Sequence, residues 1–278
     1  MSTEGHRMDF SLNTIQGVSV LSCDAFDRAG GVAHGFSTRL GGVSEGVWAG
    51  LNLGYNRGDD PDRVRENFRQ FCTAIGGDYK GLVKTRQVHG CHVQPVTDAD
   101  RGMDPIPPAP WETDGLITDC PGLCLAVFCA DCVPVLLYDP VRRCIAAVHS
   151  GWRGTASAIA QRAAEQMITD YGCDPANILA AIGPSIGKCC FETHADVPDA
   201  MTDALGSLAA PHIDALPTGK FRVDLRGIIR STLLRAGLED SHICVSDHCT
   251  VCRPDLYWSH RVLGDQRGSM AAMIQLTE

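Results

Sequence analysis

Residues 123–149 read LCLAVFCADCVPVLLYDPVRRCIAAVH, and this stretch decides the fold. It contains three short apolar runs, at 123–129, 133–138 and 144–149, and an Asp-Pro turn separates the last two. Apolar runs of this length that are bounded by turn residues are typical of β-strands. We therefore expect three neighbouring strands in the middle of the chain.

Helices are expected at 60–76, 155–171 and 224–236, where apolar residues recur with helical spacing. The first of these begins with Asp60, which can cap the helix, and with Pro61, which suits its first turn. Each of the three helices presents one apolar face that must pack against another part of the molecule.

Further strands are expected at 178–182, 242–246 and 271–276, and surface loops at 98–112 and 205–220. Strands occur in groups, with helices between the groups. This order favours an α+β fold with layered, mixed sheets over a regular βαβ repeat.

The composition excludes several classes of protein. A net charge of −9 disfavours non-specific nucleic-acid binding, because such affinity comes mainly from phosphate neutralisation. The sequence contains no apolar run of about 18 residues, the length that a membrane span needs, and its polar start lacks a signal-peptide core. We expect a cytoplasmic protein, in which most of the fourteen cysteines are reduced and buried.

Three residues that can bind a metal each follow a strand-like run: His89, Cys132 and His149. Catalytic zinc sites commonly use three protein ligands and leave the fourth position to water. His92 and Cys129 compete for two of these roles. We prefer His89 because a glycine opens the backbone beside it, and we expect one cysteine only, because positions three apart on a strand point to opposite faces.

A second candidate metal site is the Cys-x-x-Cys motif of Cys249 and Cys252, to which Cys189, Cys190 or Cys244 could contribute. The competing interpretation is a set of packed, reduced thiols, and we favour that interpretation here.

A larger set of segments occurs in an order that resembles the YfiH-like family, also called laccase-domain or multicopper polyphenol oxidase proteins. The matching segments are 34–44 (HGFSTRLGGVS), 51–54 (LNLG), 67–68 (NF), 87–90 (QVHG), 113–115 (TDG), 130–136 (ADCVPVL), 149–154 (HSGWRG), 181–187 (AIGPSIG) and 224–225 (DL).

The resemblance implies an α/β/β/α layered sandwich, related to a toxin family of cysteine hydrolases, in which residues 1–278 form one catalytic domain. It implies a zinc ion held by His89, Cys132 and His149. It also implies phosphorolysis of adenosine, inosine, guanosine or methylthioadenosine, with adenosine deaminase activity beside it. The expected partners are a nucleoside and phosphate, with no nucleic acid and no membrane.

Five other residues are candidates for supporting roles. Asp131, next to the expected ligand Cys132, could orient a group or move a proton. Arg39 lies in a glycine-rich turn and Arg153 precedes a helix, so both are candidates for a phosphate cradle. Asn52 and Gln87 lie in matching segments and are expected to contact substrate.

The carboxyl-terminal segment departs from the family pattern. The family usually closes with a serine-tyrosine-arginine-arginine stretch and then a glycine-arginine pair, whereas this chain has 259–262 (SHRV) and 268–269 (GS). Two arginines are therefore missing, although Arg267 is nearby. This departure bears on substrate preference and leaves the metal ligands unchanged.

Three alternatives to a zinc nucleoside enzyme stay open. A copper-dependent polyphenol oxidase would need many more histidines than the ten present, which include no His-x-His pair. A cysteine hydrolase that edits peptidoglycan precursors would use Cys132 as nucleophile and His149 as base. A non-catalytic binding protein would have a structural zinc ion with all four positions filled by the protein.

Overall fold

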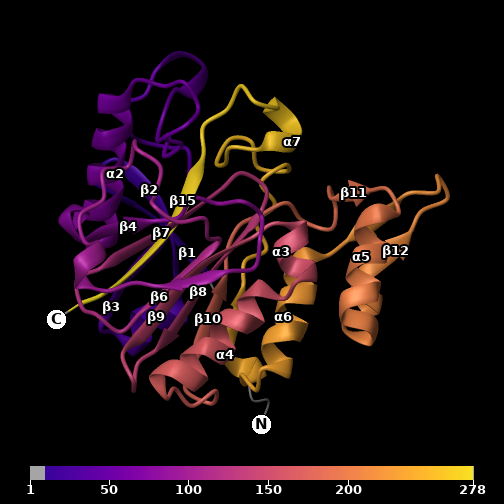
Figure 1. Cartoon of the computed structure of the whole chain (residues 1–278). Coiled ribbons are helices and arrows are strands. Elements are labelled where there is room, and N and C mark those ends of the chain that lie inside the picture. The colour runs from indigo at the N-terminus through magenta and orange to yellow at the C-terminus, as the bar shows by residue number, and fades with distance from the viewer. Residues whose placement is uncertain (1–9, 278) are drawn as a thin grey trace, which may run out of the picture.

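The computed structural model describes residues 10–277, which form two large sheets packed face to face with helices outside them (Figure 1). The first sheet has the order β1 (Phe10–Ile15), β2 (Val18–Cys23), β3 (Val32–Ser37), β15 (Met270–Leu276), β7 (Cys124–Cys129) and β4 (Leu82–Lys84). The second has the order β14 (Ile243–Val245), β10 (Leu179–Ile182), β8 (Val133–Asp139), β9 (Cys144–Ser150), β6 (Gly115–Thr118) and β5 (Val93–Pro95).

Both sheets are mixed. In the first sheet β4 runs parallel to β7, and in the second β5 runs parallel to β6 and β10 to β14, while the other neighbours are antiparallel. The pairing of β6 with β9 places Gly115 opposite Val148, so the residues that flank these two positions meet at one end of the sheet. That end carries the candidate site.

Helices cover the outer face of each sheet. Helix α2 (Pro61–Ile75) packs on the first sheet, and α4 (Ile159–Tyr171) and α6 (Leu225–Arg235) pack on the second. The predicted α/β/β/α sandwich is therefore confirmed. Among residues 10–277, no helix has the length and apolar character that a membrane crossing needs.

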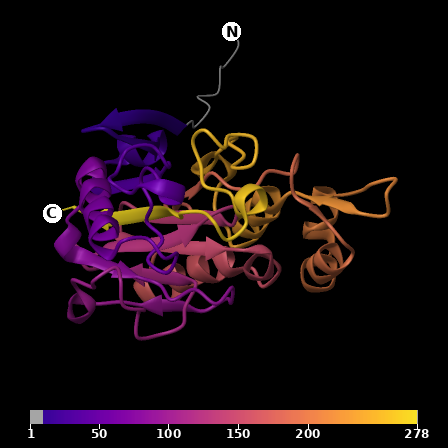
Figure 2. The same ribbon diagram turned by 90° about the horizontal axis from the view of Figure 1, so that it is seen from above.

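The described part of the chain also contains smaller elements. They are α1 (Asp24–Ala29), α3 (Trp152–Ala156), α5 (Asp196–Leu205), α7 (His260–Leu263) and a three-stranded sheet of β11 (Glu192–Thr193), β13 (Phe221–Val223) and β12 (Ile213–Ala215). Figure 2 shows α5 and this small sheet projecting from one end of the sandwich.

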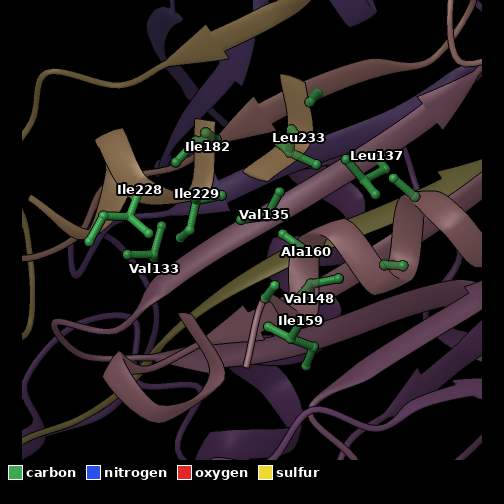
Figure 3. Close-up of a cluster of buried hydrophobic side chains, with 14 of the residues drawn as sticks. Val133, Val135, Leu137, Val148, Ile159, Ala160, Ile182, Ile228, Ile229 and Leu233 are labelled. Atoms are coloured by element: carbon green, nitrogen blue, oxygen red, sulfur yellow. The ribbon is translucent and has the colours of Figure 1, made fainter. Parts of the chain in front are cut away.

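The central strand β8 is covered on both faces, which explains why its sequence is apolar. Val135 and Leu137 point outward to the helices, and Leu136 and Tyr138 point inward to the other sheet. Successive side chains of a strand alternate between its two faces, so a strand that is covered on both faces needs apolar residues at every position. Figure 3 shows the outer cluster, in which Val135 and Leu137 lie near Ile229 and Leu233.

The predicted strands are confirmed with boundaries that shift by at most one residue, and so are the helices at 60–76 and 224–236. Asp60 caps α2, because its side chain accepts hydrogen bonds from the N–H groups of Asp62 and Arg63.

The predicted helix at 155–171 is wrong in its first turns. The chain forms a short helix α3 and then α4, and Ala158 between them has a left-handed φ of 54°. The Thr155 hydroxyl bonds to that of Ser150 at 2.8 Å, which holds α3 against the end of β9. The expected loop at 205–220 is also wrong, since it contains strand β12 and two 3₁₀ turns.

Replacement of Leu136 by alanine tests the packing between the two sheets. Leu136 is fully buried there, and we expect Leu136→Ala to lower the free energy of unfolding by about 2–5 kcal/mol, measured by urea titration. Val141→Ala is the control, because Val141 is 67% exposed and its truncation should change stability by less than about 0.5 kcal/mol. Similar values for the two variants would contradict this account of the core.

Candidate active site

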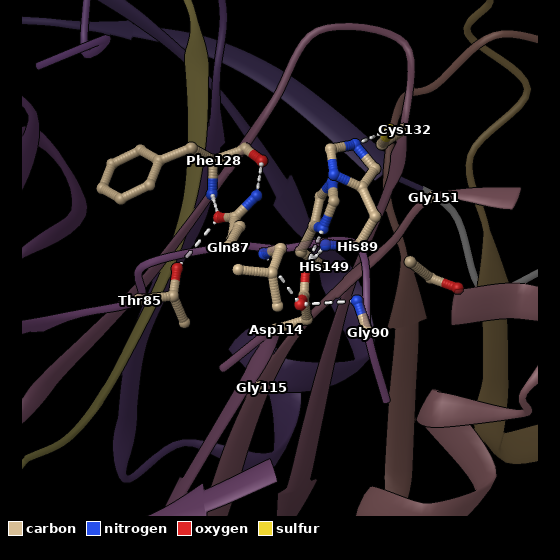
Figure 4. Close-up of polar contacts among 12 residues, drawn as sticks. Thr85, Gln87, His89, Gly90, Asp114, Gly115, Phe128, Cys132, His149 and Gly151 are labelled. Carbon is tan, nitrogen blue, oxygen red and sulfur yellow. Dashed lines mark hydrogen bonds and ion pairs between the residues drawn. The ribbon is translucent and has the colours of Figure 1, made fainter. Parts of the chain in front are cut away.

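Three segments that are distant in the sequence meet at one end of the sandwich. His149 lies near the end of β9, Cys132 lies in the turn between β7 and β8, and His89 lies in the loop between β4 and β5. Their potential ligand atoms all lie within 4.8 Å of one another, and Cys132 Sγ is 3.9 Å from His89 Nε2 (Figure 4). The structure thus brings together the three residues that the sequence singles out.

The buried carboxylate of Asp114 organises this cluster. It accepts a hydrogen bond from His149 Nδ1 at 2.8 Å and from the backbone N–H groups of Val88, His89 and Gly90 at 3.1, 3.0 and 2.8 Å. The N–H of His149 also donates to the Asp114 carbonyl at 2.7 Å. Because Nδ1 is occupied by this bond, the Nε2 atom of His149 is left to face Cys132.

The backbone around the cluster is tightly constrained. His89 has a φ of 60°, a left-handed conformation that costs a non-glycine residue free energy and occurs often at functional sites. A Cβ at Gly151 would lie 2.9 Å from His89 Cδ2 and 3.2 Å from Cys132 Sγ. Glycine at this position therefore keeps the space beside the three side chains open.

The cluster also shifts the pKa values of its members. Burial opposes ionisation of Cys132, but the charge of His149 and hydrogen bonds from both histidines lower the pKa of the Cys132 thiol to about 6. Burial likewise opposes protonation of His149, yet the Cys132 thiolate and Asp114 raise the pKa of His149 to about 9. Without a metal, both pKa shifts favour a thiolate–imidazolium pair over a neutral pair.

A pocket of about 420 Å³ opens beside the cluster, a volume within the usual range for small-molecule sites. Its wall is partly aromatic and partly cationic. The aromatic members are Tyr55, Phe128, Trp152 and Phe191, and the arginines are Arg57, Arg261 and Arg267. Asp131, Gln87 and His260 also line it. The combination suits a ligand with a flat apolar part and an anionic part.

Gln87 lines the pocket, but its amide is engaged by the protein. Its Oε1 accepts from the N–H of Phe128 at 2.7 Å and from Thr85 Oγ1 at 2.9 Å, and its Nε2 donates to the Phe128 carbonyl at 2.8 Å. In this structure Gln87 joins its loop to the end of β7.

Asp131 also makes contacts within the protein. Its carboxylate accepts hydrogen bonds from Thr250 Oγ1 at 2.6 Å, Ser259 Oγ at 3.1 Å and the N–H of Arg261 at 2.7 Å. Its φ is 89°, so the turn beside Cys132 is held in a strained conformation. Asp131 thereby attaches the carboxyl-terminal segment to the pocket.

Asn52 is fully buried outside the pocket lining. Its Oδ1 accepts from the N–H groups of Gly54 and Ser269 at 2.8 and 3.0 Å, and its Nδ2 donates to Asp59 at 2.8 Å. These contacts join two loops of the chain and occupy the amide.

Arg39 and Arg153, the expected phosphate ligands, are absent from the lining of the 420 Å³ pocket. The guanidinium of Arg39 stacks on Trp258 at 3.8 Å and donates to the Pro254 carbonyl at 3.1 Å. That of Arg153 lies over the ring of Trp152 at 4.1 Å and lines a second depression, which shares His89 and Trp152 with the first pocket. The cations on the pocket wall are other arginines.

Sequence reasoning overlooked Asp114 and Arg57 as site residues. Asp114 had a recognisable signal, since it lies in the matching segment 113–115 (TDG). No comparable signal distinguishes Arg57, which lies in an irregular turn-rich segment that the fold alone brings to the pocket.

Residues 33–277 match the family model described as multi-copper polyphenol oxidoreductase laccase. The chain belongs to this family. It is 38% identical over 261 residues to purine nucleoside phosphorylase YlmD of Geobacillus stearothermophilus, an alignment that covers 91% of this chain and 93% of that protein. It is 35% identical to adenosine deaminase RL5 from an unknown prokaryotic organism, with 84% and 90% of the two chains covered.

Solved structures of this family agree with the fold. The crystal structure of YlmD from Geobacillus stearothermophilus superposes with a TM-score of 0.89 at 34% identity, covering 98% of this chain and all of that one. The crystal structure of the hypothetical protein YfiH of Bacillus licheniformis gives the same TM-score and identity, with 96% and 99% covered. The resemblance inferred from the sequence motifs is thus confirmed.

Alkylation of Cys132 tests the electrostatics of the cluster. In metal-free protein, the rate of iodoacetamide modification at Cys132, followed by peptide mass spectrometry, should rise with pH to a plateau with a midpoint near pH 6. Below that midpoint the thiol is protonated and the rate should fall about tenfold per pH unit. In His149→Gln the midpoint should move up toward the ordinary value of about 8.5. An unshifted midpoint above pH 8 in the parent protein would refute the ion pair.

Proposed function

We propose that this chain is a purine nucleoside phosphorylase that also deaminates adenosine. The observation that carries the proposal is the convergence of His89, Cys132 and His149 beside a pocket with aromatic and cationic walls. Family relatives named for these two activities align over most of the chain and support the same conclusion. Adenosine, inosine, guanosine and methylthioadenosine are the substrates we propose, with inorganic phosphate as the second substrate.

The donor set fits a zinc ion, and we propose zinc as the cofactor. Two imidazole nitrogens and one thiolate are ligands that zinc accepts, and three protein ligands leave a position for water or substrate. The Asp114–His149 hydrogen bond is the kind of outer contact that orients a metal-binding histidine. Blue-copper sites use a similar set but usually add a methionine, and no methionine of residues 10–277 lines this pocket.

Deamination at purine C6 requires a nucleophilic water at neutral pH and a route for protons to the departing ammonia. When bound at this site, zinc would supply the Lewis acidity that lowers the pKa of a water molecule. The protein supplies the orientation: Asp114 fixes His149, and Gly151 leaves room beside the ligands. Asp131 stays a candidate for proton handling, although three protein donors already occupy its carboxylate.

Phosphorolysis requires phosphate to attack the anomeric carbon while the purine leaves as a base. We propose that Arg57 and Arg267 hold that phosphate. Both line the pocket, and in each the buried Nε has no hydrogen-bond partner within the protein, so a donor is available to an anion. Burial and the nearby Arg57 charge lower the pKa of Arg267 to about 10, which still leaves it charged at neutral pH.

The rest of the pocket suits the nucleoside. Tyr55 and Phe128 stack edge to face with ring centroids 5.5 Å apart, and Trp152 and Phe191 contribute further aromatic surface. A purine ring has two flat faces that aromatic side chains can cover. We propose that the base lies against these side chains with its C6 edge toward the three ligands.

Substitution of the pocket arginines can distinguish phosphorolysis, which uses phosphate, from deamination, which uses water. Arg57→Ala should reduce phosphate-dependent base release roughly ten- to a hundredfold, since a charge-assisted contact contributes about 1.5–3 kcal/mol, and should spare most of the deamination. Arg39→Ala is the matched control on an arginine outside the pocket and should reduce neither activity by more than a few-fold, and Arg153→Ala tests the second depression, which includes His89.

The same assay series can contradict the assignment. If only Arg39→Ala or Arg153→Ala reduced phosphorolysis, we would conclude that those arginines, and not Arg57, bind the phosphate. Equal loss of both activities in Arg57→Ala, with metal content and folding unchanged, would show that Arg57 positions the nucleoside itself.

The role of Asp114 can be tested through metal affinity. Asp114→Asn keeps the shape of the side chain but replaces an acceptor of four hydrogen bonds by an amide with one oxygen. We expect zinc affinity at the three-ligand site, measured by competition with a chromophoric chelator, to fall about 10–100-fold. Glu112→Gln is the control, because the Glu112 side chain is exposed and pairs with Arg86. Unchanged affinity in Asp114→Asn would contradict this role.

A second candidate function is amide hydrolysis by a cysteine nucleophile, with peptidoglycan precursors as substrates. One observation favours it: Cys132, His149 and Asp114 stand in the relation of nucleophile, base and orienting carboxylate. The two functions differ in metal dependence. Amide hydrolysis by this route should persist in metal-free protein, whereas the nucleoside activities should be lost in both metal-free protein and Cys132→Ala.

We further propose that residues 1–278 act as one catalytic unit in a reducing compartment such as the cytoplasm. All fourteen cysteines are unpaired in the structure, which agrees with a reducing environment.

A further inference from the structure

Four cysteines form a second cluster close in the chain to residues that line the pocket. Cys189 and Cys190 lie in the turn before β11, and Cys249 and Cys252 lie in the turn after β14. All four sulfur atoms lie within 4.8 Å of one another. Cys252 Sγ is 3.4 Å from that of Cys190 and 3.7 Å from that of Cys189.

We propose that these four thiolates bind a structural zinc ion that is separate from the site of His89, Cys132 and His149. Zinc–sulfur bonds of about 2.3 Å in a tetrahedron place the sulfur atoms about 3.8 Å apart, close to the 3.7 and 3.4 Å that separate Cys252 Sγ from those of Cys189 and Cys190. Four cysteine ligands fill the coordination shell and leave no position for substrate, so the ion serves the structure.

Backbone hydrogen bonds hold the turn of Cys249 in place beside the cluster. The N–H of Gly187 donates to Cys249 Sγ at 3.2 Å, and the carbonyl of Cys249 accepts from the N–H of Arg253 at 3.0 Å. A backbone donor to sulfur stabilises a thiolate, the form that binds metal.

Gly187 reinforces this arrangement through its lack of a side chain. A Cβ there would lie 3.1 Å from Cys189 Sγ, 3.3 Å from Cys249 Cβ and 2.9 Å from the guanidinium of Arg226. The chain therefore passes directly against two of the thiols, with a cation beside it. A four-thiolate zinc centre carries a net charge of −2, which a neighbouring arginine would partly offset.

Of the two segments that the ion would join, the first lines the pocket and the second contacts a residue of its wall. Ile186 and Phe191 flank the first cysteine pair and line the pocket wall. Thr250, within the second turn, donates to Asp131 next to the ligand Cys132, and Arg261 donates to the carbonyl of Cys190 at 3.3 Å. An ion bound here would cross-link residues about sixty positions apart and fix the wall against which substrate binds.

The competing state of the same residues is a disulfide, for which Cys190 and Cys252 are the nearest pair. A metal centre and a disulfide make opposite predictions for thiol counts and metal content. Both can be measured on the intact protein without reference to its catalytic activity.

The deciding experiment is metal analysis of the full chain, purified anaerobically with a thiol reductant and no added metal. The parent protein should hold about two zinc ions per chain, and Cys132→Ala and Cys252→Ser should each hold about one. Cys120→Ser is the matched control, because Cys120 is a partly exposed thiol outside both clusters, and it should hold about two.

Cobalt loading gives an independent signature. Cobalt in the Cys132→Ala protein should show intense thiolate charge-transfer and tetrahedral d–d absorption, because the four-thiolate site remains. Denaturation in the presence of a chelator should release all fourteen thiols in the reactive form.

Other results would overturn the proposal. One zinc ion in the parent that is lost completely in Cys132→Ala, or retention of both ions in Cys252→Ser, would exclude the second site. A deficit of two or four thiols with no metal in the cluster would identify a disulfide instead. If Cys252→Ser fails to fold, the cobalt spectrum of Cys132→Ala and the thiol count still decide. Failure of the nucleoside function would appear as inactivity of protein that holds both ions, which separates the two questions.

Discussion

The Asp114 carboxylate is the contact on which the candidate site depends. A buried charge is strongly unfavourable unless it is compensated, and here one imidazole and three backbone N–H groups compensate it. Although burial opposes its ionisation, these donors hold the pKa of Asp114 below its usual value. The stabilisation is therefore complete at neutral pH and is lost as the pH falls through that lowered pKa. One side chain thus ties the His89 loop, the start of β6 and the end of β9 together.

Much of this arrangement could be predicted from the sequence because its signals are local. The apolar runs at 123–138 identify two central strands, since strands that are buried on both faces contain few polar residues. The preference for Cys132 over Cys129 rested on strand alternation, and Cys129 is indeed buried away from the cluster, where burial raises its pKa. His92 also lies outside the cluster and bonds to Gln94.

What escaped prediction depends on tertiary contacts. The helix is interrupted at Ala158 because α3 packs against the end of β9. This tertiary contact overrides the helical pattern of the sequence. Arg57 lies in an irregular loop, and Arg267 lies in the segment just before β15. Only the tertiary fold brings both residues to the pocket. Sequence reasoning chose Arg39 for its glycine-rich turn and Arg153 for its place before a helix, and in the structure both guanidinium groups stack on tryptophans outside the lining of the 420 Å³ pocket. Side-chain direction in a loop is set by packing that no short motif encodes.

Strand β15 lies between β3 and β7 in the middle of the first sheet, although it follows every other described strand in the sequence. During synthesis, β3 and β7 therefore emerge from the ribosome well before the strand that joins them. Each then has an unpaired hydrogen-bonding edge, a feature that favours association with other chains. Both edges are paired only when β15 inserts between the two strands. Insertion also brings Arg267 and Ser269 into place, so the pocket wall and the sheet are completed in the same late event.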